Sequence, residues 1–169
     1  LVTEAGVFDS TGGRKAKAFA PVYDAHLAVG IEITRTHLGL VIIDLAGHLV
    51  RHERSRLPFS MTTEYLQALG KAVHDLIEQE KILGVGISLP GILDSTGAIL
   101  TSSHVLHVYN IATENFSRYI SYPCFFINDA NAAGLAEVYD HEGRESLVYL
   151  SLSNSVGGAI LIDGHLYTG

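Results

Sequence analysis

The sequence predicts an α/β protein built on a mixed β-sheet with helices on its faces. Two observations lead to this fold class. First, an apolar, β-branched run over residues 27–33 is followed by two further strand patterns, over residues 38–44 and 48–54, with short turns between them, as in an antiparallel meander. Second, helical patterns then alternate with further strand-like runs, over residues 63–80, 82–89, 114–120, 124–127 and 130–139. A hydrophobic content of 47% is normal for a chain that packs such a core.

The first residues do not have the pattern of a core element. Turn-forming residues are frequent, and the pair Gly12-Gly13 separates two short extended pieces at residues 1–3 and 17–19. We therefore expect residues 1–24 to form an arm or linker. The domain that follows covers residues 25–143.

The helix predicted over residues 63–80 has one apolar face. Ser60 or Thr62 can cap its N-terminus, because a hydroxyl oxygen at that position accepts a bond from an otherwise unpaired backbone N–H. Apolar residues recur along one side at helical spacing: Leu66, Leu69, Val73, Leu76 and Ile77. Gly70 interrupts the helix and should cost about 1 kcal/mol relative to Ala.

The strand predicted over residues 82–89 ends at Pro90-Gly91, a turn that brings bare backbone to the edge of the sheet. Residues 101–110 have no clear period, and we predict a loop there. A short helix is predicted over residues 114–120. A buried, apolar strand then begins at Cys124.

Asn128 and Asp129 stand directly between that strand and the helix predicted from Ala130 onward. A carboxylate in this position lies at the carboxyl edge of the sheet, where open α/β sheets bind ligands. We therefore take Asp129 as the centre of a polar small-molecule site, with a sugar as the favoured ligand. The alternative is that Asn128 and Asp129 only cap the helix, which both residue types do well.

The end of the chain repeats the pattern of the first hairpin. Residues 31–49 and 150–166 align with a two-residue gap, which matches a Gly, an Asp and a Gly-His-Leu sequence in the two segments. The strands predicted over residues 147–152 and 158–163 have no helix of their own to cover them. A duplication, rather than chance similarity of two hairpins, makes residues 144–169 the start of a second, truncated domain, with a ligand cleft between the halves.

Three segments of the sequence carry a specific resemblance. They are Ile87-Ser88-Leu89-Pro90-Gly91-Ile92-Leu93-Asp94 with Gly97, Ile127-Asn128-Asp129-Ala130-Asn131-Ala132-Ala133 with Glu137, and Val156-Gly157-Gly158-Ala159-Ile160 with Asp163-Gly164. These segments resemble the ROK family of sugar kinases and sugar-responsive transcriptional repressors, from about Val29 to Gly169. The resemblance implies the duplicated ribonuclease H-like fold of the actin and hexokinase type.

The first residues, from Leu1 to Lys15, also resemble the end of the winged helix-turn-helix that repressors of this family carry in front of the sugar domain. A flexible arm is the alternative. The resemblance thus implies a DNA-binding domain that precedes residues 1–24.

Two turns depart from the pattern of the family's kinases, in which both turns are glycine-rich phosphate loops. The first is Gly-Gly-Thr preceded by Asp in the kinases, and the second is Gly-Thr-Gly-Val-Gly. The corresponding residues here are Glu32, Thr34, Arg35 and Thr36 in the first loop, and Ser153, Asn154 and Ser155 in the second. Side chains in such loops obstruct the approach of backbone N–H groups to phosphate oxygens, which argues against ATP binding and against enzymatic activity.

In the kinases, the aspartate that matches Asp129 takes the proton from the attacking sugar hydroxyl, so Asp129 is the catalytic residue only if this chain is a kinase. Without ATP, the same carboxylate can still accept charge-assisted hydrogen bonds from a sugar, each worth roughly 1.5–3 kcal/mol. We expect Asn128, Pro90, Gly91 and His104 to contribute to the ligand site. His104 lies where family members carry a sugar-contacting polar residue.

Composition excludes several other functions. A net charge of −7 argues against nucleic-acid binding by these residues as a whole. The single cysteine, Cys124, rules out an internal disulfide and fits a reducing cytoplasm. No apolar run reaches the roughly 18 residues that span a membrane. The histidines at positions 107, 141 and 165 lack metal-ligand spacing, so no metal is expected here.

The chain begins with Leu1, and its only methionine is Met61, so we expect a fragment or a processed product. The family's zinc-binding cysteine cluster and its Glu-x-Gly-His sugar motif lie further along than Gly169. The favoured function is the effector-binding part of a homo-oligomeric ROK regulator, in which a sugar or sugar phosphate modulates DNA binding. An ATP-dependent, glucokinase-like kinase is the alternative, and a structural module with a dead site is a third.

Overall fold

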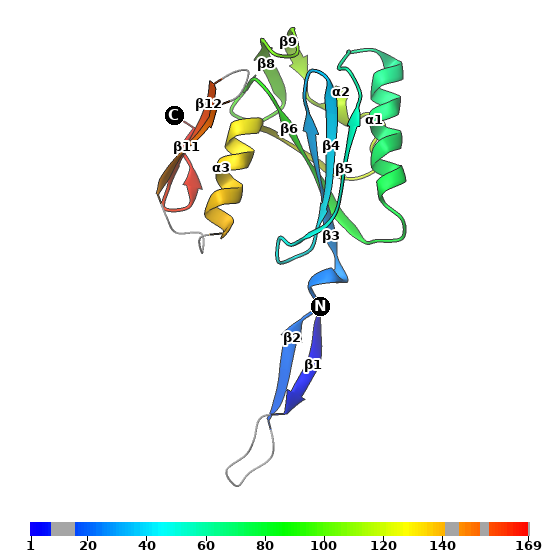
Figure 1. The fold of residues 1–169 in the computed structure, drawn as a ribbon, viewed down its shortest axis with the longest axis vertical. Coiled ribbons are helices and arrows are strands. Elements are labelled where there is room, and N and C mark those ends of the chain that lie inside the picture. The colour runs from blue at the N-terminus through cyan, green and yellow to red at the C-terminus, as the bar shows by residue number, and fades with distance from the viewer. Residues whose placement is uncertain (8–15, 141–145, 153–155, 169) are drawn as a thin grey trace.

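The computed structural model describes residues 1–7, 16–140, 146–152 and 156–168. Its main body has four layers: helix α1 (Thr63–Leu76), a five-stranded sheet, helix α3 (Asp129–Asp140) and a small three-stranded sheet (Figure 1). A two-stranded hairpin extends from one end of this body. Within the described residues, every helix is too short or too polar to cross a membrane.

The five-stranded sheet has the strand order β10-β6-β3-β4-β5. Its strands are β3 (Leu27–Ile33), β4 (His37–Ile43), β5 (Leu49–Arg56), β6 (Ile82–Leu89) and β10 (Cys124–Asn128). Strands β3, β4 and β5 pair antiparallel, which confirms the predicted meander, whereas β6 pairs parallel with both β3 and β10. The carboxyl ends of β3, β6 and β10 therefore lie side by side at one edge of the sheet.

One face of this sheet forms the main core together with α1. Alternate residues of β3 and β4 are buried there, as the pleat of a strand requires: Leu27, Val29, Ile31, Ile33, Leu38, Leu40 and Ile42. The predicted apolar face of α1 is confirmed, because Leu66, Leu69, Val73 and Leu76 are all buried. Burial of such side chains is worth roughly 1.5–3 kcal/mol each and supplies most of the stability of this half.

Helix α1 has defined ends. Thr62, one of the two predicted caps, accepts a hydrogen bond from the backbone N–H of Tyr65 through its side-chain oxygen, at 3.3 Å. The helix ends at Leu76, four residues earlier than predicted. The guanidinium of Arg51 in β5 binds the carbonyl oxygen of Leu76 and also lies 3.1 Å from Glu80, so a side chain from the sheet satisfies a carbonyl at the helix end.

A second antiparallel sheet corrects the loop predicted over residues 101–110. It consists of β7 (Ile92–Leu93), β8 (Ile99–Ser103) and β9 (Val108–Ala112), in that order. The strands are short, and His107 and Asn110 adopt positive φ angles of 55° and 52° between and within them. These bends break the alternation of apolar and polar residues on which strand prediction depends. The short helix α2 (Glu114–Ser117) follows.

Helix α3 covers the small sheet, which corrects the expectation that its strands have no helix. The sheet contains β11 (Leu147–Leu152), β12 (Val156–Ile162) and β13 (His165–Leu166). Val138 of α3 is buried against Ala159 and Leu161 of β12. The opposite face of the small sheet is exposed and apolar, with Val148, Leu150, Leu152, Val156, Ile160 and Ile162 on it.

The N-terminal residues form a hairpin of β1 (Val2–Val7) and β2 (Lys17–Pro21), followed by the 3₁₀ helix η1 (Tyr23–Ala25). Every residue of β1 is exposed, and the hairpin projects away from the main body (Figure 1). The two extended pieces expected there are strands that belong to no core. The predicted Gly12-Gly13 turn lies outside the described residues.

The hairpins of the proposed repeat share their architecture and differ by one residue in register. Ile33 pairs with Leu38 in the first hairpin, whereas Leu152 pairs with Val156 in the second. The second connection is therefore one residue shorter than the first. At the other end, the matched residues Gly47 and Gly164 adopt nearly the same positive φ, 81° and 79°.

Gly70 has a structural role that the sequence does not reveal. A Cβ atom at this position would lie 2.4 Å from the backbone oxygen of Tyr119 and 2.6 Å from its Cβ. Helix α1 therefore approaches the backbone after α2 so closely that only glycine fits. The sequence expectation of a mild helix defect accounts for propensity alone and omits this contact.

We predict that Gly70→Ala destabilises the protein by about 1–3 kcal/mol, because the new methyl group forces α1 away from Tyr119. Thermal unfolding of the full-length protein, followed by circular dichroism, measures the effect. The exposed neighbour Lys71, substituted by Ala, serves as the control and should change stability little. A stabilisation of about 0.5–1 kcal/mol by Gly70→Ala, as at an unhindered helix site, would contradict the steric argument.

Candidate functional site

Three turns meet at the carboxyl edge of the main sheet. Ser88 of β6 lies opposite Glu32 of β3 on one side and opposite Ile127 of β10 on the other. The turns that follow these strands are residues 34–36, called the first turn below, Pro90-Gly91, and Asn128-Asp129. Neighbouring strands are about 4.8 Å apart, so the first turn and Asp129 lie about 10 Å apart across the edge.

Asn128 joins two of these turns through its carboxamide. Its oxygen Oδ1 accepts a hydrogen bond from the backbone N–H of Asn131 at 3.0 Å, which caps α3. Its nitrogen Nδ2 donates to the carbonyl oxygen of Gly91 at 2.8 Å and to Oδ1 of Asp129 at 3.0 Å. Both N–H groups are thus committed to the protein, so Asn128 positions the site and has no free donor for a ligand.

Asp129 is the exposed residue at the start of α3. Its Oδ1 accepts hydrogen bonds from the backbone N–H of Ala130, at 2.9 Å, and from Asn128. Among the described residues, nothing donates to its second oxygen, Oδ2. The carboxylate is therefore fixed through one oxygen, and the other can accept bonds from hydroxyl groups of a ligand.

The Pro90-Gly91 turn packs closely against strand β8. Gly91 has φ of 143°, and a Cβ on it would lie 2.4 Å from the backbone oxygen of Ser102. Pro90 is buried, and its carbonyl oxygen accepts a hydrogen bond from the hydroxyl of Ser103. Ser103, which sequence reasoning missed, is fully buried and also accepts a bond from the backbone N–H of Leu106 at 3.0 Å. A serine within an unpatterned segment gives no local signal of such a role.

His104 follows Ser103 and is exposed, with its ring edge-on to that of Tyr109 at a centroid distance of 6.1 Å. No hydrogen bond joins it to Asn128 or Asp129 in the described part of the chain. The structure therefore brings Asn128, Asp129 and Gly91 together but leaves His104 in contact with its own hairpin.

The first turn is closed by the side chain of Thr34. The Thr34 hydroxyl donates to the carbonyl oxygen of His37 at 2.9 Å and accepts from the backbone N–H of His37 at 2.9 Å and of Thr36 at 3.4 Å. The backbone N–H of Thr34 donates to the same carbonyl at 3.0 Å. These N–H groups are therefore engaged within the turn and do not form a cradle for an anion.

Arg35 reaches out of the first turn to another loop. Its Nη1 donates to the carbonyl oxygen of Val105 at 3.1 Å, and its own carbonyl oxygen accepts from the backbone N–H of Phe59 at 3.0 Å. The guanidinium thus links the first turn to the loop after β8. The second predicted phosphate loop, Ser153, Asn154 and Ser155, lies outside the described residues.

A cavity of about 650 Å³ opens between the two halves beside Asn128. This volume suits a small ligand. Asn128 and Asn131 contribute to its lining, whereas Asp129, which lies between them in sequence, does not. The complete lining is Gly91, Ile92, Leu93, Asp94, Ser95, Thr96, Gly97, Phe126, Ile127, Asn128, Asn131, Gly158, Tyr167 and Thr168.

Asp94 adds a fixed negative charge to this lining. Hydrogen bonds from the backbone N–H of Ile99 and from the Thr96 hydroxyl hold the pKa of its carboxyl below the usual value, against a smaller opposing effect of desolvation. Asp94 is therefore ionised at neutral pH. Sequence reasoning placed Asp94 in the family motif but assigned it no role.

Glu32 lies at a different cavity, of about 610 Å³, over the sheet face opposite α1. The residues around it are mainly small or apolar and include Gly30, Gly86 and Ala132. This cavity shares only Ile127 with the one beside Asn128. The position that an aspartate occupies in the kinases is thus an exposed glutamate.

The sheet topology and the carboxylate at its edge define an α/β protein of the actin- and hexokinase-like fold. The model of the ROK family matches residues 28–169, and the chain belongs to that family. Both repressors and kinases occur among its relatives.

The xylose repressor of Bacillus subtilis is 28% identical over 181 residues, which cover 100% of this chain and 46% of the repressor. A ROK glucokinase from Streptomyces griseus, solved with glucose and AMPPNP, matches with a TM-score of 0.74 at 24% identity. The match covers 85% of this chain and 46% of the glucokinase chain. A ROK transcriptional regulator homologous to the MLC protein of E. coli matches with a TM-score of 0.75 at 18% identity. That match covers 90% of this chain and 41% of the regulator chain. The chain thus spans about half the length of the proteins it matches.

We predict that Asn128→Ala lowers stability by about 1–2 kcal/mol, because it removes the cap of α3 and the bond to the Gly91 carbonyl. Asn128→Ser is the matched comparison, since serine keeps a capping oxygen but is too short to reach Gly91. Thermal unfolding of both variants should show the larger loss for alanine. Equal stability of the alanine variant and the wild type would contradict the joining role of Asn128.

Proposed function

We propose that this chain is the effector-binding part of a ROK transcriptional regulator. A sugar or sugar phosphate binds at the carboxyl edge of the main sheet, next to the cavity beside Asn128, with Oδ2 of Asp129 as its central acceptor. Binding shifts the protein between two states that differ in their affinity for DNA. Such a shift requires only that the ligand prefers one of the two states.

The geometry of the first turn carries this proposal. A kinase needs backbone N–H groups that point at the phosphates of ATP, and here the Thr34 hydroxyl and the His37 carbonyl occupy them. Arg35 is tied to the carbonyl oxygen of Val105 and closes the turn from outside. The first turn is therefore held in place by hydrogen bonds within the protein and needs no nucleotide to order it.

The N-terminal hairpin gives a second, independent support. The family model begins at residue 28, but the alignment with the xylose repressor of B. subtilis covers the whole chain, including residues 1–27. Strands β1 and β2 form a projecting hairpin in this region, as the wing of a winged helix-turn-helix would. DNA contact then falls to a domain that includes or precedes this arm, which fits the net charge of −7 on the chain as a whole.

Residues 144–169 are, in this proposal, the first strands of a second domain of the same kind. Their outer face is apolar and exposed, which suits further chain packing against it. Zinc, where the whole protein holds it, belongs to that further part, and so do the contacts of a homo-oligomer.

We predict that Asp129→Asn abolishes the sugar response and leaves DNA binding intact. The asparagine retains an oxygen for the bonds from Ala130 and Asn128, so the variant removes charge with little change of shape. Each lost charge-assisted bond should weaken sugar affinity by about 1.5–3 kcal/mol, or 10- to 150-fold. Calorimetry on the full-length protein with glucose, xylose and N-acetylglucosamine measures the affinity, and an unchanged response would refute the role of Asp129.

A ROK sugar kinase is the second candidate, because Asp129 keeps the carboxylate that would take the proton from the sugar hydroxyl. We predict no ADP release above background when the full-length protein is given ATP and the same sugars. A coupled assay measures this, with a glucokinase as the positive control. Turnover that disappears in Asp129→Asn would establish the kinase instead. A module that binds no sugar at all would leave both candidates without support.

A further inference from the structure

We infer that the turn between β4 and β5, residues 44–48, couples helix α3 to the N-terminal arm. The inference rests on the proposed function in one respect, namely that a ligand moves α3. The contacts that would carry the movement are all present in the structure. The turn lies at the end of the sheet opposite Asn128. It touches the last turn of α3 on one side and η1, at the base of the arm, on the other (Figure 1).

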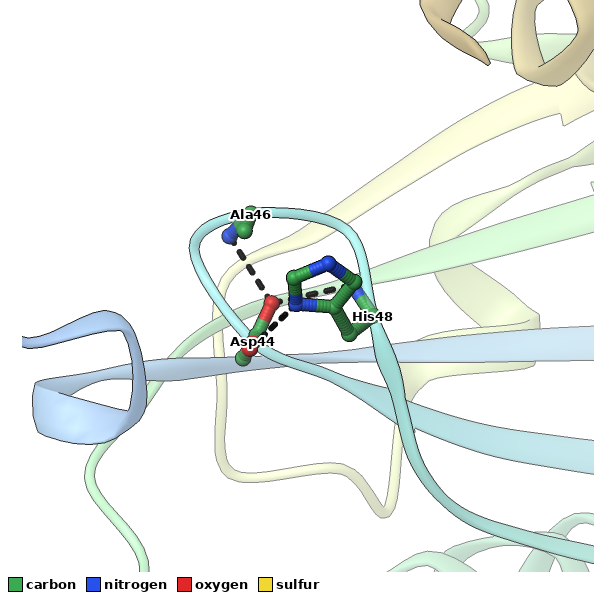
Figure 2. Close-up of polar contacts among 3 residues, drawn as sticks. All are labelled: Asp44, Ala46 and His48. Carbon is green, nitrogen blue, oxygen red and sulfur yellow. Dashed lines mark hydrogen bonds and ion pairs between the residues drawn. The ribbon is translucent and has the colours of Figure 1, made fainter.

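The side chain of Asp44 holds the turn together through hydrogen bonds. One carboxylate oxygen of Asp44 accepts hydrogen bonds from the backbone N–H groups of Ala46, at 2.8 Å, and His48, at 2.9 Å (Figure 2). The other oxygen lies 3.1 Å from Nδ1 of His48. Desolvation raises the pKa of Asp44, but these bonds together outweigh it and lower the pKa below its usual value, so the carboxylate is ionised at neutral pH.

On one side, the turn is in close contact with α3. A Cβ atom on Gly47 would lie 2.7 Å from Cε1 of Tyr139, so the tyrosine ring packs directly on the backbone of the turn. Gly47 also has a positive φ of 81°, which a larger residue would adopt only with strain. Tyr139 is in the last turn of α3, and Asp129 is the first residue of the same helix.

On the other side, the turn holds the base of the arm. The backbone N–H of Leu45 donates to the carbonyl oxygen of Tyr23 at 3.0 Å, and the rings of Tyr23 and His48 meet edge-on at a centroid distance of 6.3 Å. The backbone N–H of Val22 in turn donates to the carbonyl oxygen of Leu1, at 2.9 Å. Tyr23 of η1 is therefore bonded directly to the turn, and the hairpin, closed at its base by the bond between Val22 and Leu1, is connected to the turn through η1.

Helix α3 can carry a displacement between these points because it is a single rod of 12 residues, about 18 Å long. Its N-terminus borders the ligand cavity, and Ala130 and Gly134 pack against β12 of the small sheet. A ligand that draws the small sheet toward the turn after β6 tilts α3. The tilt moves Tyr139 against Gly47, and the turn passes the movement to Tyr23 and the arm.

The test is hydrogen exchange in the full-length protein, with and without saturating amounts of the tightest binder among glucose, xylose and N-acetylglucosamine. In the wild type, ligand should change the exchange of amides in residues 1–7 and 16–25 severalfold. Tyr139→Ala should abolish that change while its calorimetric sugar affinity stays within about twofold of wild type. Tyr139→Phe keeps the ring on Gly47 and should retain the full response.

Two results would overturn the inference: sugar binding without any change in the arm of the wild type, or a full response in Tyr139→Ala. A measurement without ligand tests the contact between Tyr139 and the turn even if no sugar binds. Tyr139→Ala should raise exchange of the Leu45 amide, which donates to Tyr23, at least severalfold, and unchanged exchange would also count against the coupling. Failure of all three sugars to bind the wild type refutes the proposed function, and this outcome is separate from the Leu45 result.

Discussion

The position of helix α3 depends on one carboxamide. Asn128 caps the helix through Oδ1, holds the Gly91 carbonyl through Nδ2 and orients the Asp129 carboxylate through its second N–H. A typical hydrogen bond contributes only about 0.5–1.5 kcal/mol to stability, but an unsatisfied partner costs more. Loss of this group would therefore leave an N–H at the helix end and a turn carbonyl unpaired, and would leave the Asp129 carboxylate with only its bond from Ala130. The polar site and the packing of the two halves depend on the same side chain.

The sequence predicts the central elements well, because their signals are local. The bounds of β3, β6 and β11 agree with the predicted ranges, since each is a short run of mainly apolar residues. What it misses depends on distant parts of the chain. Strand β9 contains Asn110 at positive φ, and only pairing with β8 makes it a strand. The need for Gly70 comes from Tyr119, 49 residues away, and no pattern around Gly70 contains that information.

The candidate site shows the same division. Asp129 could be found from its place between a strand and a helix, and the family motif adds to that. The commitment of Asn128 to the protein could not be found, because an asparagine that caps a helix and one that binds a ligand have the same local sequence. In the first turn, the sequence shows that side chains replace glycines. Only the structure shows that the Thr34 hydroxyl bonds the N–H groups of Thr36 and His37, so that it does within the protein what a phosphate oxygen does in a phosphate loop.

The two halves divide at a different place in the packing of the elements than in the prediction from the sequence. The domain boundary predicted at residue 143 follows α3, yet α3 packs on the small sheet so tightly that a Cβ on Gly134 would lie 2.8 Å from the Cβ of Ala159. Helix α3 and the small sheet therefore form one packed unit. The inferred coupling requires relative motion between α3 and the central sheet, where the cavity beside Gly30 and Gly86 leaves the packing open. On that side α3 is held near its two ends, by Asn128 and by Tyr139. A ligand beside the first can thus act on the second.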